Sequence, residues 1–326
     1  MRRGMQFFFT VAWMWASVMV AADGPSKAAL SPTEADADFP FQGEYVGEIN
    51  RDGQLTKFGL HIIARGNGKF HAVAYPGGLP GDGFLGGEKI EADGELRNGA
   101  VEFVHDNIVS TLKDGTLTTV VDGQEVAKFT KVDRKSPTLG MKPPAGAKVL
   151  FDGTSADAFE NGKIDPNGLL IQGVTSKDKF QNATLHLEFL LSYMPTATGQ
   201  GRANSGCYLQ GRYEVQILDS FGLEGKNNEC GGIYTIRDPQ VNMCYPPLSW
   251  QTYDIDFTAA KYDAEGKKTA DAKITVKHNG EVIHRDVPLP KGTTAAPVAE
   301  GPQPGPLYLQ DHGNPIRFRN IWVVEK

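Results

Sequence analysis

The segment YEVQILDS, residues 213–220, places a carboxylate and an amide on one side of a predicted β-strand. Glu214 and Gln216 alternate with three apolar residues, which is the period of a strand that packs one face on a core. A positioned carboxylate can act as a general base or acid, and an amide can stabilise a developing oxyanion. The pattern therefore indicates a catalytic face, a sugar-binding face, or a face that only meets water.

The spacing of Glu214, Gln216 and Asp219 is similar to the E-x-D-x-x-E strand of jelly-roll glucanases. Here an amide replaces the middle acid, and the shorter aspartate replaces the last one. A retaining glycosidase needs two carboxyl groups roughly 5–5.5 Å apart. This strand offers such a pair only if a bulge brings Asp219 onto the face of Glu214. The departure weakens the interpretation as an ordinary glycosidase.

Three further predicted strands also carry polar residues opposite their apolar alternation. Each strand taken alone fits the wet face of a sheet about as well as a binding face. Together, however, their glutamine, tyrosine, histidine, arginine and asparagine residues are typical of sugar-binding surfaces. The candidate substrate-binding residues are Glu188, His186, Asn204, Gln310, Asp311 and Arg319.

Some of these candidates also suit plain structural roles. Asn204, in the sequence NSG, fits a turn or a backbone cap as well as a ligand. Asp311 would either orient His312 or close the turn that follows it. Arg319 would clamp a substrate oxygen or pair with a carboxylate in the sandwich.

The turn before YEVQILDS decides which side chains oppose Glu214 and Gln216. The sequence QGRY is compatible with a two-residue turn that begins at Gly211, and this register places Leu209 and Cys207 opposite them. The polar face would then be mixed. A bulge would shift the register, and the sequence leaves both arrangements open.

The elements that carry these residues are short strands separated by turn signals. Nine or more such strands, including a hairpin at Asn279-Gly280, predict a sandwich or jelly roll over residues 147–326. Similar strands predict a smaller antiparallel β domain over residues 40–133. The Pro/Gly-rich residues 134–146 are predicted to be a connector, and residues 23–39 a linker. The fold class is therefore predicted to be all-β.

Composition limits the function classes. Charged residues make up 22% of the 326-residue chain and the net charge is −6, which argues against nucleic acid and anionic membranes as partners. Two arginines, a short apolar run and small residues predict a signal peptide over residues 1–22. The run is too short to span a bilayer, so we expect an exported protein, periplasmic or secreted, with no membrane span after cleavage.

The three cysteines lie in the second half of the chain. Export would permit a disulfide between Cys230 and Cys244. Cys207 lies within a strand pattern and is more simply a small buried apolar residue. Their spacing is not that of a zinc site.

Several short motifs follow one another along residues 147–326: LFDG, ANSGCYLQG, YEVQILDS, CGGIYTI, WQTYDIDF, HNGEVIH, LYLQDHG and FRNIWV. In this order they resemble the 3-keto-disaccharide hydrolase family. The N-terminal β domain lies outside the resemblance. The resemblance implies a concanavalin-like jelly-roll domain that acts on 3-keto-glycosides, sugars already oxidised at C3 by a separate dehydrogenase.

Such a substrate fits the altered acid pattern. A ketone at C3 acidifies the C2 proton, so the C1 substituent can leave by elimination and water can then add. This route needs a base near C2, a stabiliser for the enolate and an acid near the leaving oxygen. We expect Glu214 to be the base, Gln216 or a bound divalent metal cation to stabilise the enolate, and His312 to move protons or ligate the metal.

Two other functions stay open from the sequence. A non-catalytic carbohydrate-binding module would use the same fold and the same polar face. A direct endo-glucanase would act on unoxidised glycans. In each case the partner is a carbohydrate.

Overall fold

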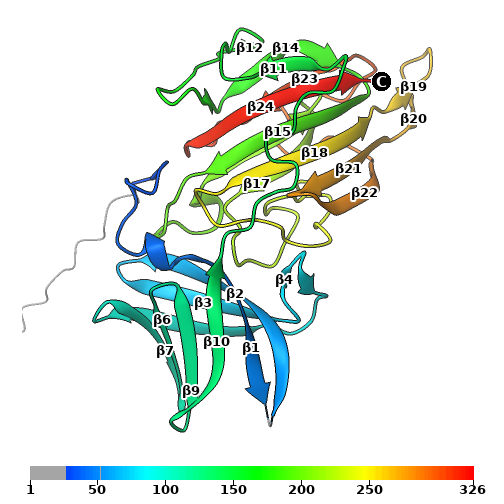
Figure 1. Cartoon of the computed structure of the whole chain (residues 1–326). Helices are drawn as coiled ribbons and strands as arrows, with labels where there is room; N and C mark the ends of the chain where they lie inside the picture. The colour runs from blue at the N-terminus through cyan, green and yellow to red at the C-terminus, as the bar shows by residue number, and fades with distance from the viewer. Residues whose placement is uncertain (1–26, 52) are drawn as a thin grey trace, which may run out of the picture.

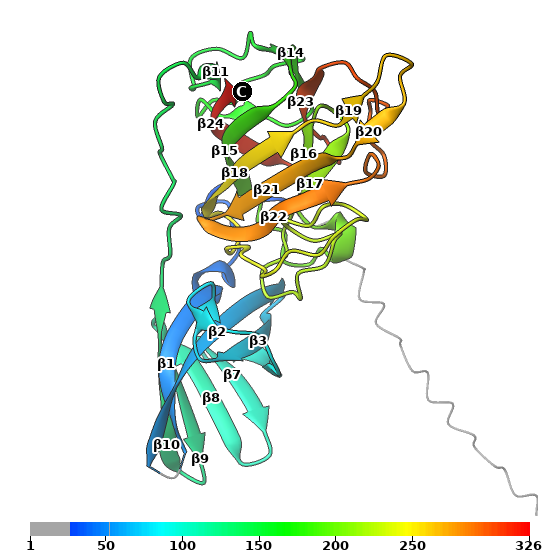
Figure 2. The same ribbon diagram turned by 90° about the vertical axis from the view of Figure 1, so that its right-hand side faces the viewer.

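The computed structural model describes residues 27–51 and 53–326, which form two β units joined by one chain segment (Figures 1 and 2). The predicted signal peptide, residues 1–22, lies outside these described residues. Within the described part, the helical pieces are two short 3-10 turns, η1 (Phe39–Phe41) and η2 (Gly199–Gly201). No helix among these residues is long and apolar enough to cross a membrane.

The first unit is a closed barrel of eight antiparallel strands. In pairing order these are β1 (Gly43–Arg51), β10 (Gln124–Val132), β9 (Thr116–Val121), β8 (Ile108–Lys113), β7 (Ala100–His105), β6 (Ile90–Arg97), β3 (Lys69–Pro76) and β2 (Gln54–Gly66). Leu60, Ile62, Phe70 and Phe129 belong to its buried core. A barrel of this size is just wide enough for side chains to fill it. Outside it, β4 (Leu79–Pro80) and β5 (Gly83–Phe84) form a short parallel pair.

The second unit is a sandwich of two sheets. The larger sheet contains, in pairing order, β11 (Lys148–Phe151), β24 (Ile316–Glu325), β15 (Ala183–Leu191), β18 (Trp250–Thr258), β21 (Ala272–His278) and β22 (Glu281–Leu289), with β13 (Leu170–Ile171) also paired to β24. The smaller sheet contains β12 (Phe159–Glu160), β14 (Val174–Phe180), β23 (Gly305–Leu309), β16 (Asn204–Leu209) and β17 (Tyr213–Leu218). A separate pair is formed by β19 (Lys261–Tyr262) and β20 (Lys268–Ala270).

One apolar core lies between the two sheets of the sandwich. Leu185, Leu187 and Phe189 of β15 belong to it, as do Val215 and Ile217 of β17. Because side chains alternate along a strand, the intervening residues of β15 and β17 point away from the core, on opposite outer faces of the sandwich. This arrangement confirms the all-β class and the concanavalin-like jelly-roll sandwich preceded by a smaller antiparallel β domain.

The segment predicted as a linker is packed in its described part, residues 27–39. Ala29 and Tyr193 exchange backbone hydrogen bonds of 3.0 and 2.9 Å, and Tyr193 Oη donates to Asp36 at 2.8 Å. The carboxylate of Asp38 accepts a hydrogen bond from the backbone N–H of Gly68 at 2.8 Å. Because these bonds reach both the sandwich and the barrel, this part of the predicted linker is packed against both units.

Barrel and sandwich meet in a buried contact. His61 of the barrel stacks on Phe221 of the sandwich, with ring centroids 4.3 Å apart. Glu44 accepts hydrogen bonds of 2.9 and 2.5 Å from Arg134. Although burial opposes ionisation, the bonds from Arg134 and His61 hold the pKa of Glu44 at about 2. The two units therefore share a packed contact at His61 and Phe221, and next to His61 an ion pair joins Glu44 of the barrel to Arg134 of the connector.

The three cysteines are buried free thiols. Cys207 belongs to the core between the sheets, as predicted. Cys230 Sγ lies 3.3 Å from Tyr253 Oη, and Cys244 Sγ faces the Leu218 carbonyl oxygen at 3.6 Å. The disulfide considered for Cys230 and Cys244 is not formed in this structure.

Candidate active site

The outer face of the smaller sheet carries the residues singled out on β17. The loop between β16 and β17 is three residues long, Gln210–Arg212, and the pairing places Tyr208 opposite Glu214 and Gly206 opposite Gln216. A two-residue turn would have placed apolar side chains there instead, so that alternative is wrong. The outward residues of β16, β17, β23 and the position after β23 are here called the polar face: Asn204, Gly206, Tyr208, Glu214, Gln216, Tyr308 and Gln310.

Glu214 is buried on the polar face, with 3% of its surface exposed. The Tyr208 hydroxyl donates a hydrogen bond to its carboxylate. Gly206 makes room for it, because a Cβ added there would lie 2.2 Å from Glu214 Oε1 and 2.7 Å from the Tyr208 ring. Burial raises the pKa of Glu214 to about 7, against the smaller opposing effect of the Tyr208 hydrogen bond. A carboxyl group with this pKa exchanges its proton near neutral pH, as general acids and bases do.

Tyr208 is held between Glu214 and the neighbouring strand β23. Its ring lies 5.3 Å from that of Tyr308, and Gln310 Nε2 donates to Tyr208 Oη at 3.4 Å. Burial keeps the pKa of Tyr208 well above its usual range, so the hydroxyl stays protonated. The Tyr208 hydroxyl therefore accepts a hydrogen bond from the Gln310 amide and donates one to the Glu214 carboxylate. Sequence reasoning missed Tyr208 because its place beside Glu214 depends on the register of the β16–β17 pair.

Gln200, in η2, binds both amides at the other end of the polar face. Gln216 Nε2 donates to Gln200 Oε1 at 3.1 Å, and Asn204 Nδ2 donates to the Gln200 carbonyl oxygen at 2.9 Å. Asn204 Oδ1 is buried and has no hydrogen-bond partner among the residues that the structure describes. Asn204 therefore caps a turn and still keeps an acceptor. No sequence pattern marks Gln200, which lies in a glycine-rich segment without strand periodicity.

Asp219 is engaged elsewhere and does not form a carboxylate pair with Glu214. It follows the end of β17, whose pairing with β16 runs in continuous register without a bulge. Arg202 binds one Asp219 oxygen at 2.6 Å, and the Phe221 N–H donates to the other at 3.3 Å. The bulge required for the paired carboxylates of a retaining glycosidase is therefore not found in this strand pair.

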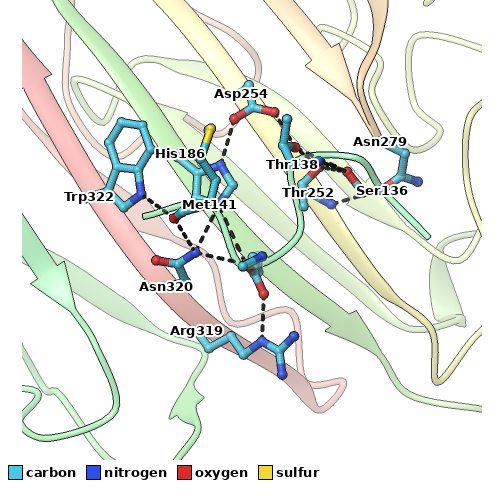
Figure 3. A network of polar contacts seen from close by, with 12 residues as sticks. Ser136, Thr138, Met141, His186, Thr252, Asp254, Asn279, Arg319, Asn320 and Trp322 are labelled. Atoms are coloured by element: carbon cyan, nitrogen blue, oxygen red, sulfur yellow. Dashed lines mark hydrogen bonds and ion pairs between the residues drawn. The ribbon is translucent and has the colours of Figure 1, made fainter. Parts of the chain in front are cut away.

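His186, Glu188 and Arg319 lie on the other side of the sandwich, on the outer face of the larger sheet. Figure 3 shows His186 and Arg319 beside the connector. Their strands β15 and β24 pair with each other, and neither pairs with β16 or β17. The prediction that these residues share one sugar-binding surface with Glu214 is therefore wrong. The sequence showed the alternation of each strand but not which sheet the strand joins.

Instead, these three residues hold the connector against the larger sheet. His186 Nδ1 lies 2.6 Å from Asp254 Oδ1. Glu188 accepts the Gly140 N–H with one oxygen and Arg319 Nε with the other, both at 2.6 Å. Although burial opposes ionisation, the hydrogen bonds from His186, Asn320, Arg319 and Gly140 hold the pKa of Glu188 at about 2. Glu188 is thus committed to a structural ion pair.

The connector itself is fastened along much of its length (Figure 3). Ser136 shares a hydrogen bond of 2.6 Å with Thr252, and Thr138 Oγ1 donates to Asp254 at 2.7 Å. The Met141 carbonyl oxygen accepts a hydrogen bond from Asn320 at 3.0 Å. The connector, residues 134–146, is therefore held against the larger sheet as far as Met141, and its residues 142–146 are exposed.

Asp311 and His312 lie on an exposed turn after β23. Asp311 Oδ1 accepts the Gly313 N–H at 2.9 Å, so Asp311 closes this turn. His312 follows it, outside the hydrogen bonds of the polar face. Within residues 27–51 and 53–326, no group of three or more histidine, cysteine or acidic side chains is placed to hold a metal ion. The divalent cation stays a prediction without assigned ligands.

The polar face lies within the part of the chain that a known family covers. The model of the 3-keto-alpha-glucoside-1,2-lyase-like domain matches residues 146–324, more than half of the 326 residues. The chain belongs to this family. The matched part is the sandwich, as the resemblance predicted, and the barrel lies outside it. Among curated proteins, none matches the chain.

Three solved structures of Parabacteroides distasonis ATCC 8503 proteins, each described as a candidate glycosyl hydrolase, are similar to the chain. One shares 32% sequence identity, covers 56% of this chain and 85% of its own, and has a TM-score of 0.52. The other two share 17% and 22% identity, cover 56% and 55% of this chain and 94% and 99% of their own, with TM-scores of 0.41 and 0.38. The family and the first structure support a glycoside-acting enzyme.

Proposed function

We propose that the sandwich cleaves 3-keto-glycosides by elimination across C1 and C2 followed by hydration, with Glu214 as the base. The observation that carries the proposal is the buried carboxyl of Glu214, whose pKa is about 7 and which a phenol binds. Such a group is a stronger base than an ordinary carboxylate and is still partly ionised at neutral pH. The family supports 3-keto-α-glucosides as the substrate class.

In the first step Glu214 takes the C2 proton, and the electrons of the C2–H bond move to the C3 ketone oxygen to form an enolate. Protonation removes the negative charge of Glu214, so the hydrogen bond that it accepts from the Tyr208 hydroxyl becomes weaker. The hydroxyl can then donate to the negatively charged enolate oxygen instead. The enolate then collapses to the ketone, the C1–O bond breaks, and the leaving oxygen takes up a proton. Water adds to C1 of the resulting enone and C2 regains a proton, so the net reaction is hydrolysis.

A retaining hydrolysis of unoxidised glycosides fits this face less well. Of the two acids in YEVQILDS, Asp219 is bound by Arg202, which leaves Glu214 on the polar face. Elimination requires one base and hydrogen-bond donors rather than two carboxylates roughly 5–5.5 Å apart. Elimination also leaves the oxidation state of the sugar unchanged, so another enzyme must oxidise C3 beforehand.

Export belongs to the proposal as well. The sequence pattern of residues 1–22 supports action in the periplasm or outside the cell. Secretion of the full-length chain from a bacterial host, with cleavage near residue 22, tests this part.

The reaction is tested by incubating the purified protein with 3-keto-trehalose beside trehalose and a soluble glucan, with and without a chelator. We expect release of the leaving sugar only from 3-keto-trehalose. Binding without release from any of the three would favour a carbohydrate-binding module, and release from the unoxidised glucan would favour a glucanase. Loss of turnover with the chelator, restored by a divalent cation, would assign the enolate to a metal ion.

A further inference from the structure

A pocket of about 670 Å³ lies between the barrel and the sandwich. The barrel lines it with Arg65, His71 and Glu91, and the sandwich with loop residues 195–199, Arg202 and parts of 221–229. Figures 1 and 2 show loops of the sandwich lying over the end of the barrel that faces it. The volume is that of pockets that bind small ligands.

Several charged side chains that line this pocket already have ionic partners, among them Arg65, whose Nη1 lies 3.6 Å from Asp93, and Glu224, which binds Lys89 at 2.5 Å. His71 lies 2.7 Å from Asp93 and 3.3 Å from Glu91, and Arg202 binds Asp219 at 2.6 Å. An ionic ligand would compete with these pairs for its partners. A neutral polyhydroxylated ligand can instead add hydrogen bonds to the donors and acceptors that remain. The lining therefore favours a sugar.

Residues 199–204 connect the pocket to the polar face. Gly199 and Arg202 line the pocket, whereas Gln200 and Asn204 are hydrogen-bonded next to Gln216. Two buried atoms of this segment, Arg202 Nε and Asn204 Oδ1, lack hydrogen-bond partners among the described residues. A ligand that extends from the polar face into the pocket would run along this segment and meet Arg202, which lines the pocket.

We propose that the pocket binds the sugar on the leaving-group side of the scissile bond, and that the barrel thereby selects disaccharide substrates. This rests on the proposed function, in which the 3-keto ring lies at Glu214. The leaving sugar needs hydrogen-bonding side chains and a volume of its own, and the pocket has a polar lining and about 670 Å³. The barrel, which lies outside the family match, would then contribute one wall of the substrate site.

The test compares 3-keto-trehalose with methyl 3-keto-α-glucoside, which has the same reacting ring and a minimal leaving group. Arg65→Ala removes a donor from the barrel wall, and Thr198→Trp fills the pocket from the sandwich side. The Arg65 side chain is 53% exposed and Thr198 is exposed, so both variants should fold. We expect KM for 3-keto-trehalose to rise about tenfold in each variant, with kcat unchanged and the methyl glycoside unaffected.

Arg97→Ala is the matched control. Arg97 is another arginine of the barrel, and its side chain is 60% exposed and paired with Glu95. Arg97 does not line this pocket. The Arg97→Ala variant should have the wild-type KM for both keto-sugars. Binding of unoxidised trehalose, measured by titration calorimetry on the same proteins, gives a readout that does not need turnover.

The two proposals fail in different ways. If KM for 3-keto-trehalose and the binding of trehalose are both unchanged in Arg65→Ala and Thr198→Trp, the pocket has no role in substrate binding. If wild type turns over neither keto-sugar but binds trehalose, and both variants lose that binding, elimination at Glu214 is overturned while the pocket stands as a sugar site.

Discussion

The burial of Glu214 lets us predict how the free energy of unfolding of the Glu214→Gln variant depends on pH. Folding raises the pKa of Glu214 from its ordinary value of 4.5 to about 7, because burial disfavours the charged form. Each pKa unit corresponds to about 1.4 kcal/mol, so the ionised carboxylate lowers the free energy of unfolding by about 3 kcal/mol above pH 7. The folded protein binds this proton more tightly than the unfolded chain. The penalty is therefore absent below pH 4.5 and grows as the pH rises toward 7.

Glutamine keeps the shape of glutamate and carries no charge. Glu214→Gln should therefore be more stable than wild type by up to about 3 kcal/mol at about pH 8, and no more stable at about pH 4. Urea unfolding of both proteins at the two pH values measures the difference. A variant that is equally stable or less stable at the higher pH would refute the claim that Glu214 is buried as a charged base.

Glu188→Gln is the control with the opposite sign. Its hydrogen bonds hold the pKa of Glu188 at about 2, below its ordinary value of 4.5, so ionisation stabilises the folded state above pH 4.5. This stabilisation is lost only as the pH falls toward 2. Glu188→Gln should therefore unfold at lower urea concentration than wild type at about pH 8, and should leave turnover unchanged, because Glu188 lies on the other sheet.

Three other predictions concern the polar face and the connector. Gly206→Ala should lower turnover by about 10²-fold or more, because the added Cβ would displace the Glu214 carboxylate. Gly201→Ala is the control and should not lower turnover, because a Cβ added at Gly201 has no atom within 4 Å. Equal turnover of Gly206→Ala and wild type would contradict the placement of Glu214. The value of kcat/KM should fall as the pH drops below about 7, where Glu214 becomes protonated, and a flat profile between about pH 5 and 8 would argue for another base. Subtilisin should cut first within the exposed residues 142–146, and mass spectrometry that finds the first cut within 134–141 would contradict the docked connector.

Local patterns in the sequence predicted the strands and several turns correctly. The Asn279-Gly280 hairpin is confirmed, since His278 pairs with Glu281 and both turn residues have positive φ, 50° and 87°. Positive φ at both positions is what a two-residue type I′ turn requires, and the Asn-Gly pair provides it. Here a local rule was enough because the conformation is decided by two adjacent residues.

The membership of each strand in a sheet could not be predicted in the same way. β15 and β17 show the same alternation of polar and apolar residues, yet β15 pairs with β24 and β18, whereas β17 pairs with β16. This pairing depends on long-range contacts, and alternation alone does not encode it. For that reason alternation alone predicts one surface for Glu188 and Glu214, although one is a structural ion-pair partner and the other a candidate base.

The site was likewise only partly predictable. Glu214 and Gln216 were found from their alternation, but Tyr208 and Gly206 acquire their roles from the three-residue loop that sets the register. Gln200 and Arg202 lie in irregular backbone, where no periodicity marks a functional side chain. The interdomain pocket depends on how two separate folding units pack, which no local pattern reports.

The rate of C1–O bond cleavage by Glu214→Gln tests the central claim most directly. With methyl 3-keto-α-glucoside as substrate, the enone and the released methanol are followed against time for wild type and variant. We predict that cleavage slows by about 10²–10⁴-fold, the usual contribution of a positioned general base, while KM changes little. A Glu214→Gln protein that forms the enone at the wild-type rate would contradict the assignment of Glu214 as the base.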